Sequence, residues 1–149
     1  MREMGPGILL RPAERDDLAA VEQLLTASGL PLAGVGEAFA NFVVAEHVGR
    51  IIGVTGLERR AQYGLLRSAA VASEWRGRAV GAALVERVIH DANQNGVQAI
   101  YLLTTTAERY FPSFGFSVVE RATVPEEIRN TVEFVDACPA SAVVMERRL

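Results

Sequence analysis

Hydrophobic and polar residues alternate with two different periods along the chain, and each period predicts its own kind of element. In segments 13–28 and 78–93, apolar residues recur every three to four positions with polar residues on the opposite face, which predicts two amphipathic helices. Shorter helices are expected at residues 106–113 and 125–137. Apolar runs rich in valine and isoleucine predict strands at residues 8–11, 42–46, 51–58, 65–72, 97–103, 116–119 and 142–145.

The order of these elements predicts an α+β fold with one mixed, mostly antiparallel sheet and helices on both of its faces. Loops of hairpin length join the strands between residues 42 and 72, so these strands are antiparallel. The run 97–103 is almost entirely apolar, which indicates burial on both faces, and the helix 78–93 precedes it. The strand 65–72, this helix and the strand 97–103 therefore form a βαβ unit with one parallel pair. The chain shows no repeat or linker, and its 149 residues predict a single domain.

Composition excludes several classes of protein. The net charge of −3 argues against a nucleic-acid-binding protein, which usually presents a basic face. No apolar span approaches the ~20 residues that cross a membrane, and the N-terminal residues do not resemble a signal peptide, so we expect a cytoplasmic protein. One cysteine, Cys138, and two histidines, His47 and His90, are too few for a disulfide framework or a structural zinc site, and we expect no metal.

A stretch rich in arginine and small residues leads into the long helix, with the sequence Val-Ala-Ser-Glu-Trp-Arg-Gly-Arg-Ala-Val-Gly-Ala-Ala-Leu over residues 71–84. The first N–H groups of a helix have no partners within the helix and carry partial positive charge, so they attract anions. Small residues let a diphosphate approach the backbone, and arginines add charge-assisted hydrogen bonds. The residues alone leave two interpretations open, an anion site or a tight helix start that permits close packing.

The same stretch resembles the cofactor-binding segment of the GNAT superfamily of N-acetyltransferases, whose signature is Arg or Gln, two residues, Gly, one residue, then Gly or Ala. The matching positions are Arg76, Ala79 and Gly81, and Ala79 departs from the usual first glycine. Residues 103–116 are similar to the strand, helix and Gly-Phe element that ends the superfamily's cofactor site. With the strand–helix junction at residues 11–18, the likeness covers almost the whole chain.

Nearer resemblances suggest what is acetylated. Segments 124–128 and 138–142 resemble the small acetyltransferases associated with arsenic-resistance genes, and segment 102–105 resembles the acetyltransferase domain of N-acetylglutamate synthases. The resemblance implies one N-acetyltransferase domain over residues 1–149 that moves an acetyl group from acetyl-CoA directly onto the amine of a small, amino-acid-like acceptor, for example in detoxification. Segment 123–142 would fold over this acceptor. The sequence leaves the oligomeric state open, with a homodimer as one option because related proteins are commonly dimers.

The resemblance also implies where the acetyl donor binds. In the superfamily two parallel strands splay apart, and the pantetheine arm of coenzyme A lies between them; here these strands would end at Val71 and Leu103. Backbone groups on the first strand would bond the arm, and the amides of residues 76–82 would hold the pyrophosphate. The expected cofactor-binding residues are Ala70, Val71, Ala72, Arg76, Gly77, Arg78, Ala79, Val80, Gly81, Ala82, Thr104 and Phe111.

Acetyl transfer to an amine needs a base for the ammonium group and an acid for the departing thiolate. Glu58, near the end of a strand, is the candidate base, and the alternative is a solvated glutamate beside Arg59 and Arg60. Many superfamily members carry the acid on a tyrosine four residues before the Gly of the Gly-Phe pair, a position that Phe111 holds here. The neighbouring Tyr110 is therefore the candidate acid, and the alternative is a purely structural ring.

Arg67 interrupts an otherwise apolar strand. Alternation places it on the same face as Leu65 and Ala69, where it could line the acceptor cleft and bind an acceptor carboxylate through two hydrogen bonds. The alternative is an arginine on a solvated sheet face.

Two other functions also stay open: an acetyl-CoA-binding sensor without catalysis, for which Phe111 argues, and a protein N-terminal or lysine acetyltransferase, which would need an open groove.

Overall fold

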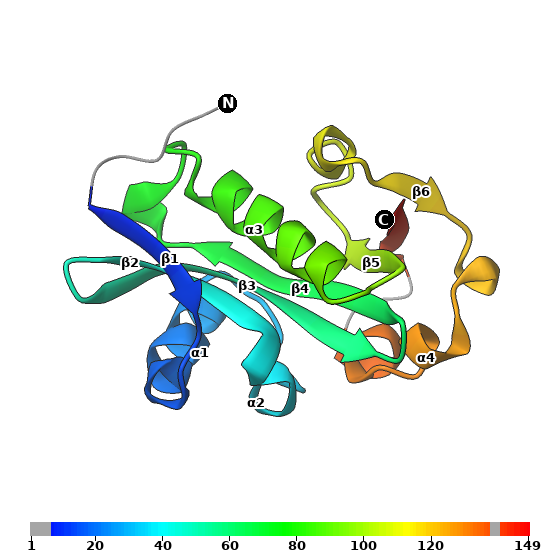
Figure 1. The fold of residues 1–149 in the computed structure, drawn as a ribbon, viewed down its shortest axis with the longest axis horizontal. Coiled ribbons are helices and arrows are strands. Elements are labelled where there is room, and N and C mark those ends of the chain that lie inside the picture. Colours follow the sequence, from blue (N-terminus) through cyan, green and yellow to red (C-terminus); the bar gives the residue numbers. More distant parts are fainter. Residues whose placement is uncertain (1–6, 138–140) are drawn as a thin grey trace.

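The computed structural model describes residues 7–137 and 141–149. The predictions that concern Cys138 and the first six residues lie outside these ranges. One seven-stranded sheet organises the described chain, with the strand order β1-β2-β3-β4-β5-β7-β6 (Figure 1). The strands are β1 (Ile8–Pro12), β2 (Phe42–His47), β3 (Arg50–Arg60), β4 (Tyr63–Val71), β5 (Ala99–Thr104), β6 (Ser117–Val119) and β7 (Val143–Arg148).

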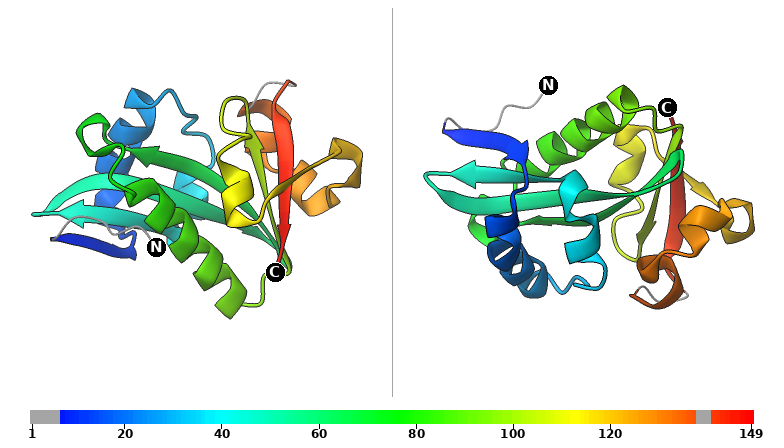
Figure 2. Two further views of the ribbon diagram at one scale, coloured as in Figure 1. Left: turned by 90° about the horizontal axis from the view of Figure 1, so that it is seen from above. Right: turned by 60° about the horizontal axis from the view of Figure 1, so that its bottom comes forward.

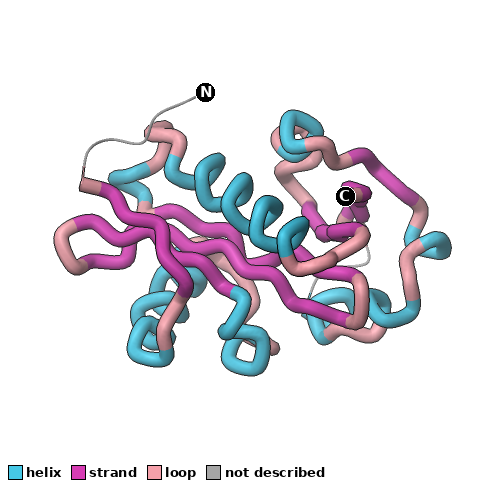
Figure 3. Tube along the Cα trace, viewed as in Figure 1, coloured by secondary structure: helices cyan, strands magenta, loops and turns pink. Residues whose placement is uncertain are grey.

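Helices cover both faces of the sheet, as predicted (Figures 1 and 3). The long helix α3 lies on one face, and the other α-helices lie on the opposite face. Besides α3 (Val80–Gln94), the α-helices are α1 (Leu18–Ala27), α2 (Val35–Ala38) and α4 (Glu126–Arg129). The short 3₁₀ helices are η1 (Arg15–Asp17), η2 (Phe39–Asn41), η3 (Ser73–Trp75), η4 (Phe111–Phe114) and η5 (Arg121–Thr123), and η6 (Glu133–Ala137) is a π-helical turn. In the described residues no helix combines the length and the apolar character needed to cross a membrane.

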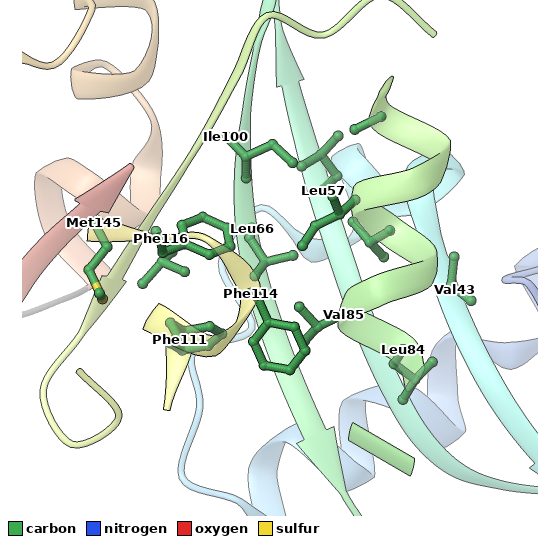
Figure 4. Packing of buried hydrophobic residues seen from close by; sticks show 14 of the residues in the cluster. Val43, Leu57, Leu66, Leu84, Val85, Ile100, Phe111, Phe114, Phe116 and Met145 are labelled. Atoms are coloured by element: carbon green, nitrogen blue, oxygen red, sulfur yellow. The ribbon is translucent and has the colours of Figure 1, made fainter. Parts of the chain in front are cut away.

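The largest core fills the space between α3 and the sheet. Leu84, Val85 and Val88 of α3 are almost fully buried against β2, β3 and β4, which explains the apolar rows of this helix. Figure 4 shows Phe111, Phe114 and Phe116 pointing into the same core from the segment that follows β5. The segment that resembles the end of a cofactor site is thereby fixed against α3.

The parallel pair in the sheet is short. Strands β4 and β5 pair at three positions near their beginnings, from Tyr63 with Ala99 to Leu65 with Tyr101. Beyond Leu65 the two strands diverge, and β5 continues with β7 as its partner (Figure 2). The splayed pair predicted from the sequence is therefore present.

A β-bulge in β4 lies where the strands begin to diverge. Gly56 pairs with Arg67 and Val54 pairs with Ala70, so Ser68 and Ala69 together face the single residue Thr55. Ser68 accordingly takes a positive φ of 60°. The extra residue shifts the alternation of side chains, and Ala70 rather than Ala69 packs in the core beneath α1. Simple alternation, which places Ala69 on the same face as Arg67, is therefore interrupted by the bulge, although both residues line the cavity between the strands.

Two predicted helices differ in form from the structure. The expected helix at 106–113 is a bend followed by the 3₁₀ turn η4, because Pro112 cannot continue an α-helix ladder and Gly115 ends the turn with a φ of 88°. The expected helix at 125–137 is divided into α4 and the π-helical turn η6. Val124 and Ile128 pack on Leu65 and Tyr101 in a smaller core, the α4 core, and this packing positions the segment before η6.

Candidate active site

The loop that enters α3 presents backbone donors at the end of β4. Gly77 and Ala79 both take positive φ values, 77° and 63°, and Ala79 caps the helix without a side-chain hydrogen bond. The first bond of the helix runs from the amide of Ala83 to the carbonyl of Ala79 at 3.1 Å. As in any α-helix, the amides before it point out of the N-terminus, and they can accept an anionic partner.

The arginines of this loop are held in place by neighbouring groups. Arg76 Nε donates to the carbonyl of Val71 at 3.2 Å, which folds its side chain back over the end of β4. The guanidinium of Arg78 lies 4.9 Å from the centre of the Trp75 ring, and this ring packs on His47 with centroids 4.6 Å apart. The end of β2 thereby supports the loop that is predicted to bind an anion.

Ala79 occupies a backbone conformation that favours glycine, so the departure from the superfamily signature has a measurable cost. Ala79→Gly is expected to raise the free energy of unfolding by about 0.5–1 kcal/mol, because an L-side chain is strained at this φ. Urea denaturation measures the change. Ala83→Gly, inside the same helix, is the control and should instead lose about 1 kcal/mol. Equal losses in both variants would show that the strain at Ala79 is absent.

A cavity of about 300 Å³ fills the gap between the diverging strands. Its walls come from β4 and its bulge, the end of β5, the chain after α1, and the segment near η6.

The amide of Ala72 donates to the carbonyl of Ile52 at 2.8 Å and so points toward β3. In an antiparallel ladder the neighbouring residue faces the other way, so the N–H and C=O of Val71 face the gap.

Tyr110 and Phe111 lie on different sides of the same short segment. The hydroxyl of Tyr110 lies 3.8 Å from the position that a Cβ on Gly81 would occupy, so it reaches the first turn of α3. Its ring packs edge-on against Phe111 and Phe114, and the side chain remains 42% exposed. Phe111 is buried and lines the cavity. The structure thus brings Tyr110 together with the predicted pyrophosphate loop.

Thr104 combines a capping role with a place in the cavity wall. Its Oγ1 accepts hydrogen bonds from the amide of Ala107 at 2.9 Å and from the amide of Thr106 at 3.4 Å. These bonds turn the chain away from β5 immediately after the strand ends. Residues 104–107 consequently form one side of the cavity.

Arg67 is the centre of a buried polar cluster. Its Nη1 donates to Glu58 Oε1 at 3.0 Å, its Nη2 to the carbonyl of Ala33 at 2.5 Å, and its Nε to Ser68 Oγ at 3.1 Å. A second carboxylate, Glu133 Oε2, lies 3.8 Å from Nε. The side chain of Arg67 has no exposed surface, so the alternative of an arginine on a solvated face is excluded.

Glu58 is also buried, which excludes the alternative of a solvated strand-end glutamate. Its Oε1 accepts from Arg67, and its Oε2 accepts from Arg60 at 2.6 Å and 3.1 Å. The residues that line the cavity in the described chain include Arg67 but not Glu58, which borders a separate hollow beside α2. Glu58 therefore reaches the predicted acceptor cleft through Arg67.

Sequence reasoning did not identify Glu133 or Ser68 as parts of this site. Ser68 is brought in by the bulge, and Glu133 by the packing of segment 123–135 in the α4 core with Leu65 and Tyr101. Neither placement has a local sequence signal, because both depend on pairing between distant segments. The position of Glu133 agrees with the expectation that this segment folds over the acceptor cleft.

Comparison with known proteins agrees with the geometry. Residues 38–118 match the family model of the acetyltransferase (GNAT) domain. The chain belongs to the GNAT acetyltransferase family. An amino-acid acetyltransferase of Mycobacterium tuberculosis is 30% identical to this enzyme over 130 residues, which are 80% of this chain and 74% of the relative. The enzyme is therefore an acetyl-CoA-dependent N-acetyltransferase of the GNAT type.

Two solved structures share the fold of this GNAT enzyme. A Mycobacterium tuberculosis protein in complex with CoA superposes with a TM-score of 0.81 at 25% identity, covering 95% of this chain and 99% of that one. N-acetylglutamate synthase from Neisseria gonorrhoeae, complexed with coenzyme A and N-acetyl-glutamate, gives a TM-score of 0.82 at 22% identity, covering 95% of this chain and 35% of that one. The predicted family, fold and enzyme class are thus confirmed.

Proposed function

We propose that this enzyme acetylates the amino group of a small amino acid or a close analogue, and that Arg67 binds the acceptor carboxylate. The observation that carries the proposal is a fully buried guanidinium in the wall of a cavity between the splayed strands. Arginine matches a carboxylate through paired, charge-assisted hydrogen bonds. The volume of about 300 Å³ is at the lower end for ligand pockets, which favours a small acceptor. The relative named amino-acid acetyltransferase supports the same class.

Acetyl-CoA fits the site as the donor. Its pantetheine arm would lie beside Val71, whose N–H and C=O face the gap, and its pyrophosphate would lie on the amides at the start of α3. Arg76 would exchange the carbonyl of Val71 for the phosphate, since a guanidinium binds an anion more strongly than a neutral carbonyl. Of the other predicted residues, Thr104 and Phe111 line the cavity, whereas the side chains of Ala70 and Val80 are buried in the cores on either face of the sheet.

Tyr110 is the proposed acid. The acceptor amine attacks the thioester carbonyl carbon and forms the C–N bond; the C–S bond then breaks, and the tyrosine hydroxyl protonates the departing sulfur. The new amide nitrogen returns a proton to the phenolate, so the tyrosine is restored. Tyr110 lies in the segment that follows β5, and its neighbour Phe111 lines the cavity between the strands, which supports this role. The sequence predicts Glu58 as the base, but this side chain does not line the cavity and contacts it only through Arg67.

A panel of acceptors tests the proposed function. Purified enzyme with acetyl-CoA is given amino acids, the corresponding amines and amides that lack the carboxylate, arsenic- and phosphorus-containing amino-acid analogues, and peptides, while released thiol is measured. At least one small amino acid or analogue is expected to react about 100-fold faster than its decarboxylated amine, because Arg67 would then lose its partner. Binding of CoA without turnover of any amine would indicate the sensor, and preferred acetylation of peptides would indicate a protein acetyltransferase.

A further inference from the structure

Two carboxylates contact Arg67, and of these Glu133 is among the described residues that line the cavity whereas Glu58 is not. Glu58 accepts hydrogen bonds on both oxygens, from Arg67 at 3.0 Å and from Arg60 at 2.6 Å and 3.1 Å. To take a proton from an acceptor, it would have to release one of two guanidinium groups. Glu58 instead holds the Arg67 guanidinium in position from the side that faces away from the cavity.

Glu133 is placed differently. Among the described residues that line the cavity, it supplies the single carboxylate, and it faces the residues of β4 and β5 between which the thioester would lie. Its side chain is buried, and its Oε2 lies 3.8 Å from Arg67 Nε, beyond hydrogen-bond distance. Among the contacts of the Arg67 guanidinium given above, the one to Glu133 is the longest. A ligand that separates Arg67 from Glu133 therefore breaks the weakest of these contacts.

From these contacts we propose that Glu133 receives the ammonium group of the acceptor and removes its proton, while Arg67 holds the acceptor carboxylate. The inference rests on the proposed function, because it requires an acceptor that carries both charges. An amino acid that enters between the two side chains brings its carboxylate to Arg67 and its ammonium to Glu133. Each buried charge then gains a new partner as the old pair separates, so no charge is left uncompensated in the cavity.

The chemistry balances without a further reactant. The Glu133 carboxylate takes one proton from the ammonium group, and the neutral amine attacks the thioester as described above. Glu133 then releases that proton to solvent, so the net reaction converts the ammonium form of the acceptor and acetyl-CoA into the N-acetyl product, free CoA thiol and one proton. Because the site is buried and excludes water, the attraction between the ammonium group and the Glu133 carboxylate is strong before the proton is transferred.

Several charged groups of the described chain surround Glu133 and set the conditions of its test. Arg67 from β4 faces it directly, and Glu58 from β3 and Arg60 lie behind Arg67. Arg121 from η5 lies over the ring of the adjacent Phe134, 5.1 Å from its centre. Arg67 and Arg121 are the cations of the described chain on these two sides.

The test compares Glu133→Gln with Glu58→Gln, using an acceptor that the wild type turns over. At pH 7, Glu133→Gln is expected to lower kcat/KM by about 100-fold, because the acceptor must then arrive already deprotonated. The deficit should shrink steadily as the pH rises toward 9, where the free amine becomes abundant. Glu58→Gln should keep the pH profile of the wild type, since Glu58 acts by positioning Arg67. Calorimetry should give unchanged affinity for CoA in Glu133→Gln.

The outcomes separate this inference from the proposed function. Wild-type kcat/KM in Glu133→Gln, or a loss that is the same at every pH, overturns the role of Glu133. A pH-dependent loss in Glu58→Gln alone assigns the base to Glu58 instead. If Glu133→Gln does not fold, Glu133→Asp decides: it should keep the wild-type pH profile with lower kcat, and a changed profile or full activity overturns the inference. Failure of the wild type to acetylate any amino acid refutes the proposed function itself, and the inference falls with it.

Discussion

Arg67→Met is expected to lower the free energy of unfolding by about 3–4 kcal/mol. The substitution keeps a side chain of similar length but takes the guanidinium away from the buried carboxylates of Glu58 and Glu133. Removing one partner of a buried ion pair costs far more than the pair contributes, because the remaining charge stays desolvated. The carbonyl of Ala33 also loses its donor. Urea denaturation monitored by circular dichroism measures the loss.

Arg60→Met is the matched control for this prediction. Arg60 pairs with the same Glu58, at 2.6 Å, but its side chain is 45% exposed. An exposed ion pair contributes little, so this variant should lose no more than about 1 kcal/mol. Losses of equal size in the two variants would contradict the claim that burial makes Arg67 the centre of the cluster.

Gly56→Ala is expected to destabilise the enzyme by about 3 kcal/mol. Gly56 pairs with Phe42 across β2 and β3, and the phenyl ring lies over the glycine. A Cβ at this position would lie 2.2–2.4 Å from three ring carbons, closer than atoms can approach. Phe42 is only 1% exposed and packs on Phe39, so its ring has no free space to enter. Overpacking of this kind costs up to about 3 kcal/mol.

Gly36→Ala separates this clash from any general effect of removing a glycine. Gly36 lies in α2, and a Cβ there would meet no atom within 4 Å. Alanine also favours a helix by up to about 1 kcal/mol over glycine, so stability should stay the same or rise. Thermal unfolding of both variants gives the comparison. A Gly56→Ala enzyme as stable as the wild type would show that the contact between Gly56 and Phe42 is not as the structure places it.

Periodicity and local chemistry predicted the elements well. The apolar rows of α3 and the continuous apolar run of β5 each follow from burial against the sheet, and both signals are contained within the element itself. The start of α3 was predicted for the same reason, because unpaired amides at a helix start are a local feature. The splay of β4 and β5 came instead from the resemblance, since no single strand reveals where its pairing with another strand ends.

The polar cluster could not be predicted in this way. Alternation along β4 places Arg67 on the correct face but misses the bulge at Ser68, which changes the face of every later residue. The burial of Glu58 depends on Arg67 and on the chain after α1, and the position of Glu133 depends on how the segment around α4 packs on Leu65. These are contacts between distant parts of the chain, and only the folded structure determines them.

Amide hydrogen exchange measured residue by residue by NMR, with and without saturating CoA, is the most direct test of where the donor lies. The account predicts that the amides of Val71 and of residues 80–82 exchange at least about tenfold more slowly when CoA is bound. The amide of Ala72, already bonded to Ile52, should change little. Unchanged exchange at Val71 and at the start of α3 in the presence of bound CoA would contradict the placement of the acetyl donor between β4 and β5.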